Sequence, residues 1–332
     1  MLMVSNQDNI VNITVGFPLG CIDPAYAALP TEFIQSDGIA HIRLGSTECP
    51  ISVVSRAPGQ ANVTFLEKEI IVGKQGNGLA TDADCILDMV VQREAREGTE
   101  ALGEAGIRDE LMTFIFGGQD TTSTVLRWLV KYFTNDPETQ QRLHDEVCRV
   151  FGKDDGEKEP IDFNLLDNPE QVPFLEAVVT ETLRCAGVGS QISRELIQDE
   201  VILGRPVPKG TQLVFAMGMM SRDKSEWGPD ADEWRPTRWL THDGIFDRSA
   251  GPSFPFGLGH RSCFGQRLAS KILPRPVSSE SLQQVLQIKT FVAILSRSFF
   301  FKPVPTEVGS MEAFETLIKQ PKHCYVLLGR WE

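Results

Sequence analysis

The longest helical pattern in the sequence runs from about Ile107 to Thr134 and carries two adjacent glycines where its apolar residues are densest. About 27 residues is far more than the mean helix length in globular proteins, so this helix is expected to cross the whole domain. Each Gly inside a helix costs about 1 kcal/mol relative to Ala. The segment GGQDTT therefore indicates either a bulky group lying close to the backbone of Gly117 and Gly118 or a tolerated defect.

The remaining segments predict a mainly α protein with small β-elements. Amphipathic helices are predicted at about residues 82–98, 137–152, 173–187 and 289–297. Short strands separated by turns are expected between residues 195 and 217 and again at 324–329. Residues 222–256 are rich in Trp, Pro and Asp, which indicates an irregular but well-packed segment. Residues 1–75 show no sustained period and are left without a predicted fold.

The charge balance and the cysteines exclude several classes of function. The chain has 332 residues, with 32 Lys and Arg against 45 Asp and Glu, for a net charge of −13. Non-specific nucleic-acid binding needs a basic face, so no nucleic-acid partner is expected. The seven Cys are scattered without CxxC spacing, so neither a disulfide framework nor a zinc site is predicted. No segment reaches the ~18 apolar residues of a membrane span.

The sequence FPFGLGHRSCFG at residues 254–265 places one Cys in a glycine-rich loop. Gly257, Gly259 and Gly265 permit unusual backbone angles and a close approach of the backbone to another group. Cys263 precedes a predicted helix start, where the helix dipole and the free amides stabilise a thiolate. Arg261 could bind a carboxylate. A thiolate held in this way is a metal ligand or a nucleophile, and a nucleophile would need the adjacent histidine as its base.

The pattern F-G-x-G-x-R-x-C-x-G in this loop resembles the haem-binding signature of the cytochrome P450 monooxygenases, and every fixed position matches. The resemblance implies a cytochrome P450 fold lacking its N-terminal part, with haem (heme b) as cofactor. It implies Cys263 as the thiolate ligand of the iron. The other matched positions are then expected to bind the cofactor, with the Phe beside the thiolate and the Arg facing a propionate: Phe256, Gly257, Gly259, Arg261 and Gly265.

The GGQDTT segment resembles the oxygen-binding part of the long central helix in the same family. The resemblance implies that Gly117 and Gly118 let the helix backbone lie close over the porphyrin. Thr121 is expected to bend or open the helix through its hydroxyl group. Asp120 and Thr121 are the expected catalytic residues, which deliver protons during oxygen activation. Candidates for the substrate pocket are Phe114, Phe116, Val188 and Ile192.

Further charged positions match the family. Glu181 and Arg184 lie three residues apart on one predicted helix, hence on one face. The family pairs this motif with a later Arg, here Arg238 in WRPTRW, and the resemblance implies a buried structural ion cluster that holds the loop on the haem side. Arg194, in QISRE, matches the position of an Arg that binds the haem propionates.

The sequence departs from the family in two places. Residues 1–75 do not resemble the family's longer N-terminal part, so we expect a haem-thiolate domain over residues 76–332 of a truncated or mispredicted gene product. Residues 270–284 carry two prolines and a serine cluster where a helix should continue, which indicates an inserted loop. The resemblance implies the cytosolic face of the endoplasmic reticulum membrane, although no counterpart of the family's anchor is found.

The resemblance implies a monooxygenase that inserts one oxygen atom from O2 into a small apolar organic substrate, in the style of fungal enzymes of secondary metabolism. Electrons are expected from NADPH through a separate NADPH-cytochrome P450 reductase, because nothing in the sequence resembles a nicotinamide or flavin site. The alternative is a non-catalytic, truncated remnant that keeps the signature but cannot hold haem. The complete signature and ion cluster favour the enzyme.

Overall fold

The structure is a computed structural model, and it describes residues 40–43, 102–153, 161–263, 265–266, 287–305 and 309–331. Predictions outside these residues include the helix at 82–98, the domain boundary near residue 75 and the inserted loop at 270–284. The described elements are helices with short antiparallel strands between them. The prediction of a mainly α protein with small β-elements is therefore confirmed.

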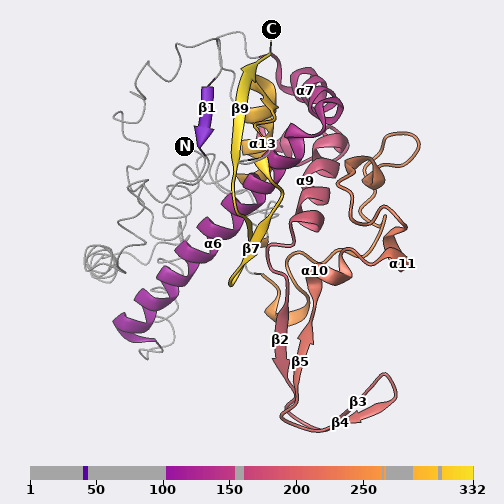
Figure 1. Ribbon diagram of the computed structural model, residues 1–332. Coiled ribbons are helices and arrows are strands. Elements are labelled where there is room, and N and C mark those ends of the chain that lie inside the picture. Colours follow the sequence, from indigo (N-terminus) through magenta and orange to yellow (C-terminus); the bar gives the residue numbers. More distant parts are fainter. Residues whose placement is uncertain are drawn as a thin grey trace.

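Helix α6 (Gly103–Thr134) runs across the molecule (Figure 1), and it ends where the sequence predicts, although it begins slightly earlier. Asp136 then caps helix α7 (Pro137–Phe151), because its carboxylate accepts a hydrogen bond from the Thr139 amide at 2.9 Å. Pro137 occupies the first turn of α7, where its missing N–H leaves no carbonyl without a donor. The Asp-Pro pair thus separates two helices that lie at an angle.

The other elements confirm the predicted helices at 173–187 and 289–297 and the predicted strands. They are shorter and follow in chain order as α8 (Phe163–Leu166), α9 (Pro173–Ala186), β2 (Ile192–Glu195), β3 (Glu200–Ile202), β4 (Arg205–Val207), β5 (Gln212–Phe215), α10 (Met217–Met220), α11 (Lys224–Trp227), η2 (Pro236–Trp239), η3 (Gly259–Arg261), α13 (Gln287–Ser298), β6 (Phe299–Lys302), β7 (Ala313–Glu315), β8 (Lys319–Pro321) and β9 (Tyr325–Arg330).

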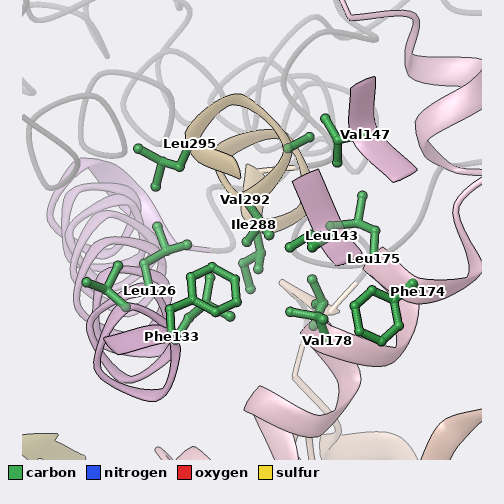
Figure 2. Packing of buried hydrophobic residues seen from close by; sticks show 14 of the residues in the cluster. Leu126, Phe133, Leu143, Val147, Phe174, Leu175, Val178, Ile288, Val292 and Leu295 are labelled. Atoms are coloured by element: carbon green, nitrogen blue, oxygen red, sulfur yellow. The ribbon is translucent and has the colours of Figure 1, made fainter. Parts of the chain in front are cut away.

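The main core lies where α6, α7, α9 and α13 meet. Figure 2 shows side chains from these four helices converging on one another. Fully burying an aliphatic or aromatic side chain of this size stabilises a fold by about 1.5–3 kcal/mol. Members of the cluster that are at most 2% exposed include Leu126, Phe133, Leu143, Val147, Leu175, Val178, Ile288 and Val292.

A three-stranded antiparallel sheet, in the order β1–β9–β6, flanks the helices. Strand β1 (Ala40–Arg43) belongs to the region for which the sequence predicted no fold, and it pairs with β9 from the opposite end of the chain. Helix α7 is joined to the sheet through Gln140, which is buried. Its side-chain amide donates to the Phe301 carbonyl at 3.0 Å, and its side-chain oxygen accepts from the Phe301 amide at 2.7 Å.

Strands β2 and β5 form a ribbon that points away from the helices and ends in the β3–β4 hairpin (Figure 1). The turn before β5 contains Gly210 at φ +81°, as the Pro-Lys-Gly sequence predicts. Among the residues placed here, none of the helices is both long enough and apolar enough to cross a bilayer.

Candidate functional site

The loop that carries Cys263 is closed by main-chain hydrogen bonds. The Cys263 amide donates to the Phe256 carbonyl at 2.8 Å, and the Gly257 amide donates to the Phe254 carbonyl at 3.0 Å. Gly257 and Gly259 adopt φ values of +71° and +73°. A side chain at either position would strain the backbone, so the glycine spacing read from the sequence is a requirement of the turn.

The Cys263 thiol lies exposed at the end of this loop. A Cβ built on Gly265 would lie 3.6 Å from the Cys263 Sγ, so the glycine keeps the surroundings of the sulfur open. Gln266 donates its amide to the Cys263 carbonyl at 3.2 Å, which is the turn expected at the start of a helix. The helix itself lies outside the described residues. Phe256 is half-buried and His260 is exposed.

Other cysteines lie in a different environment. Of the four thiols that the structure describes, Cys185 and Cys324 are buried and Cys148 is half-buried. Burial raises the pKa of Cys185 to about 12 and the pKa of Cys324 to about 11. Those two thiols are poor metal ligands and poor nucleophiles, because the thiolate is the reactive form.

The structure brings Glu181, Arg184 and Arg238 together in a buried cluster. The Arg184 guanidinium donates to both carboxylate oxygens of Glu181, with Nε–Oε2 and Nη2–Oε1 distances of 2.8 Å. The Arg238 Nε donates to Oε1 at 2.9 Å. The side chains of Glu181 and Arg184 are fully buried and that of Arg238 is 5% exposed. Such a bidentate, enclosed contact is the strong form of an ion pair.

Two partners of Glu181 were not foreseen from the sequence. The Trp239 indole donates to Oε2 at 2.8 Å, and the Arg235 main-chain amide donates to Oε1 at 2.9 Å. Both donors lie in the WRPTRW stretch that also supplies Arg238. The second Trp of this stretch was the sequence signal that could have identified the indole donor. Burial by itself would raise the pKa of Glu181, but hydrogen bonds from Arg184 and from these donors outweigh it and hold the pKa below its ordinary value.

The cluster ties α9 to the irregular segment at 221–239. The Arg184 Nη1 donates to the carbonyls of Ser221 and Ala231 at 2.8 and 2.7 Å, and Nη2 donates to the Glu233 carbonyl at 3.0 Å. The guanidinium also lies over the Trp227 ring, 4.8 Å from its centroid. One buried cation therefore fixes several turns of the chain that leads to the Cys263 loop.

The GGQDTT segment lies within α6, and the helix stays continuous through it. The Thr121 hydroxyl donates to the Gly117 carbonyl at 2.6 Å. The expected contact of the hydroxyl with the helix backbone is present, but the helix does not open, because a carbonyl has a second lone pair and can accept this bond in addition to its helical one. A Cβ built on Gly117 would meet no atom within 4 Å, so the space beside this glycine is open.

Asp120 lies next to Thr121 and is exposed at the surface. Partial burial by its surroundings raises the pKa of Asp120, and the positive charge of Arg127 opposes this in part. Arg127 is itself held by a hydrogen bond from Nη1 to the Gln320 side chain at 3.0 Å. Asp120 thus has a carboxyl group with an increased tendency to hold a proton.

Arg194 and Arg261 are the two predicted propionate ligands. Within the described ranges, neither Arg194 nor Arg261 forms an ion pair. Arg261 is exposed in η3, while Arg194 is half-buried on β2 and donates to the Ser193 carbonyl at 2.7 Å. The Ile192 Cδ1 lies 4.0 Å from a Cβ built on Gly257, so the start of β2 lies beside the Cys263 loop.

The structure describes the side chains of only some of the predicted substrate-pocket residues. Phe114, Val188 and Ile192 are half-buried, as is Gly118. The side chain of Phe116 lies outside the described part of the chain. The hydrogen bonds of Thr121 and of Cys263 given above stay within their own segments.

Comparison with known proteins gives the chain its family. The family model for cytochrome P450 matches residues 64–273, which is well over half of the chain and includes every site residue predicted from the sequence. A cytochrome P450 monooxygenase of Fusarium sporotrichioides, TRI13, is 30% identical over 304 residues, or 76% of this chain and 48% of the relative. A bifunctional cytochrome P450/NADPH–P450 reductase of Gibberella moniliformis is 33% identical over 204 residues, or 61% of this chain and 17% of the relative.

A third relative, the Hps1-dma1 cluster cytochrome P450 monooxygenase cyp3.1 of Dothistroma septosporum, is 28% identical over 262 residues, or 67% of this chain and 78% of the relative. The chain thus spans about half the length of the first relative and a smaller part of the second. Because the family model matches most of the chain and includes the closed Cys263 loop, the chain belongs to the cytochrome P450 family.

Proposed function

We propose that this chain is the haem-thiolate part of a monooxygenase that inserts one oxygen atom from O2 into a small apolar organic substrate. The observation that carries the proposal is the Cys263 loop, in which an exposed thiol stands at the end of a turn that two positive-φ glycines and a Cys263–Phe256 main-chain bond hold in place. The family to which the chain belongs binds haem iron through a Cys thiolate, and this thiolate favours cleavage of the O–O bond.

The residues present fit a haem. Cys263 offers one exposed sulfur, whereas Cys185 and Cys324 are held as buried thiols. Arg194 and Arg261 are cations without an acidic partner among the described residues, as carboxylate-binding groups should be before the cofactor binds. Gly117 leaves room for a flat group beside α6. We therefore assign Cys263 to the iron, Arg194 and Arg261 to the propionates, and Phe256, Gly257, Gly259, Gly265, Gly117 and Gly118 to cofactor contacts.

The proton-handling role falls to Asp120 and Thr121. Partial burial raises the pKa of Asp120 above its ordinary value, so this carboxyl group holds a proton more readily than a fully exposed Asp. The Thr121 hydroxyl donates a hydrogen bond to the Gly117 carbonyl at 2.6 Å, so its oxygen is left as an acceptor toward other groups. This arrangement supports Asp120 as a proton donor and Thr121 as the group that orients the proton path.

The buried cluster of Glu181, Arg184 and Arg238 takes a structural part in the proposal. It holds the segment at 221–239 against α9, and this segment leads directly to the loop of Cys263. We assign the cluster the role of keeping the thiol loop in one position. We assign it no step of the reaction.

The proposed substrate and the proposed electron donor rest on separate observations. Phe114, Phe116, Val188 and Ile192 are apolar, which suits an apolar organic substrate in secondary metabolism. Electrons from NADPH through a reductase are supported by a relative whose name joins a cytochrome P450 to an NADPH–P450 reductase. A place at the cytosolic face of the endoplasmic reticulum follows from the resemblance alone.

The test is the spectrum of the purified chain after reduction and addition of carbon monoxide. A thiolate-type shift of the Soret band is expected in the native chain and is expected to be lost in Cys263→Ser. Cys148→Ser is the matched control, because that thiol is half-buried on α7 and should leave the spectrum unchanged. A chain that binds no haem, or a Cys263→Ser chain with the native spectrum, would overturn the proposal. Substrate turnover with NADPH and a reductase then tests the reaction.

A further inference from the structure

The connection between β2 and β5, residues 196–210, forms a protruding tip that carries exposed aliphatic side chains. Leu203 is 98% exposed, Ile197 is 84% exposed and Val201 is 71% exposed. The β3–β4 hairpin makes up most of this ribbon tip. Figure 1 shows the hairpin at the far end of the β2–β5 ribbon, away from the helices. The ribbon tip therefore presents apolar groups on a protrusion and takes no part in the core.

The turn of the hairpin holds a leucine in a backbone conformation that leucine disfavours. Leu203 and Gly204 lie between the paired residues Ile202 and Arg205, and their φ values are +51° and +76°. A two-residue turn with positive φ at both positions favours Asn-Gly, because most side chains are strained there. Among the residues that the structure describes, no other non-glycine residue has a positive φ. A strained Leu that packs against nothing indicates a contact outside the fold.

The charged side chains of the ribbon tip differ in what they bind. The Asp199 carboxylate accepts a hydrogen bond from the Lys209 main-chain amide at 2.7 Å, and the Glu200 carboxylate accepts one from the Gln198 side chain at 2.7 Å. The two basic side chains, Arg205 and Lys209, are exposed and form no ion pair with any described residue. Two cations beside an aliphatic tip suit a surface that carries phosphate groups above an apolar layer.

The main chain of the ribbon tip disfavours a protein strand as its partner. Pro206 lies in β4 and Pro208 directly follows it, and neither residue has an N–H to donate. A strand added to the β4 edge would therefore find few donors. A protein partner would also need a pocket shaped for the protruding side chains, whereas a fluid bilayer accepts them without one. The shape and the chemistry of the tip thus fit a phospholipid surface.

We propose that the ribbon tip docks this chain on the surface of a phospholipid bilayer. The side chains of Ile197, Val201 and Leu203 enter the boundary between the headgroups and the acyl chains, and Arg205 and Lys209 bind phosphate groups. Removing a Leu side chain from water is at least as favourable as the left-handed backbone conformation is costly. Contact with lipid therefore offsets the strain that the free chain carries at Leu203.

The test is flotation of the purified full chain in a density gradient with vesicles of phosphatidylcholine and phosphatidylserine. The native chain is expected to float with the vesicles. Leu203→Asn should weaken the apparent affinity about tenfold, the lower end of the range for moving a Leu side chain from apolar surroundings into water. Asn tolerates a positive φ better than Leu, so the melting temperature without vesicles should stay the same or rise. A weaker affinity would then not result from an unfolded hairpin.

Two matched controls separate the ribbon tip from the rest of the surface. Leu317 is 97% exposed in the turn between β7 and β8, so Leu317→Asn removes an equally exposed leucine elsewhere and should leave vesicle binding unchanged. Arg205→Gln and Lys209→Gln should each weaken binding to these anionic vesicles about fivefold. Lys153→Gln, at an exposed position after the end of α7, should not weaken it.

Three results would overturn the proposal. The first is equal flotation of the native and the Leu203→Asn chains. The second is an equal loss of flotation in Leu317→Asn, which would make the effect a general property of exposed leucines. The third is self-association of the native chain without vesicles that Leu203→Asn abolishes, which would assign the tip to a second copy. Because the readout is vesicle binding, a failure here is distinct from a failure of the chain to bind haem.

Discussion

Replacing Glu181 by Gln is expected to destabilise the fold by about 3–5 kcal/mol. The change keeps the size of the side chain but removes its charge, so Arg184 and Arg238 stay buried without a counterion. The Arg184 side chain is fully buried and the Arg238 side chain is 5% exposed, so water cannot take the place of the carboxylate. The new amide would also turn hydrogens toward groups that now donate to Glu181. Such a loss is a large share of a typical stability of about 5–15 kcal/mol.

Urea unfolding followed by tryptophan fluorescence measures this loss, because Trp227 and Trp239 contact the cluster. Glu312→Gln is the matched control. Its carboxylate lies 3.0 Å from the Lys322 Nζ but is 65% exposed, so the expected change is less than about 1 kcal/mol. Equal unfolding midpoints for the Glu181→Gln and Glu312→Gln chains would refute the reasoning that enclosure gives the pair its strength.

The same substitution has a predicted dependence on pH. Burial would raise the pKa of Glu181, but the bonds from Arg184 hold it below the ordinary value of 4.5. The stability that the carboxylate contributes is therefore fully present above that value and is lost as the pH falls through the lower folded pKa. The difference in unfolding free energy between the native chain and Glu181→Gln should be constant near neutral pH and shrink in acid. A difference that shrank as the pH rose would contradict this sign.

Three further substitutions test other parts of the structure. Gly117→Ala should stabilise the haem-free chain by about 0.5–1 kcal/mol in a thermal melt, because Ala favours a helix and its Cβ would meet no atom within 4 Å. The same change should weaken the binding of carbon monoxide to the haem-loaded chain. Unaltered binding would argue against a close approach of the haem to the helix backbone at Gly117. Gly329→Ala should lower stability by about 1–3 kcal/mol in urea, because its Cβ would overlap the Phe300 ring across the β6–β9 pair, and an unshifted midpoint would disprove this overlap. Lys289→Met should cost about 3 kcal/mol near neutral pH, because Glu176 would remain buried without its cation. Burial raises the pKa of Glu176, and the charge of Lys289 lowers it in part. In a pH series of urea unfolding, the stability lost in Lys289→Met should therefore grow as the pH rises through that raised pKa and shrink in acid. A stability loss that did not change with pH would contradict this prediction.

The sequence predicts the long helices well because their signal is local. A period of 3.6 residues and the Asp-Pro pair at 136–137 determine where α6 ends and α7 begins. Strand β1 could not be predicted in the same way. Its four residues are held by β9 from the other end of the chain, and no local pattern contains that partner.

The sequence predicted only part of the buried ion cluster. The spacing of Glu181 and Arg184 places them on one face of a helix, and Arg238 follows from the resemblance to the family. The Trp239 indole and the Arg235 amide reach the same carboxylate because the turns of residues 221–239 fold over α9. A hydrogen bond from a main-chain amide depends on where the chain passes, and side-chain identity does not encode it.

What the sequence by itself determined is the chemistry on offer: a thiol in a glycine turn, a helix with two glycines and an acid, and an ExxR pair. What only the tertiary structure decided is which side chains are exposed to solvent. Cys185 and Cys324 are buried and Cys263 is exposed, although all three are the same residue type. The physical reason is that desolvation depends on every atom packed around a group, and in a folded chain most of those atoms come from residues far away in the sequence.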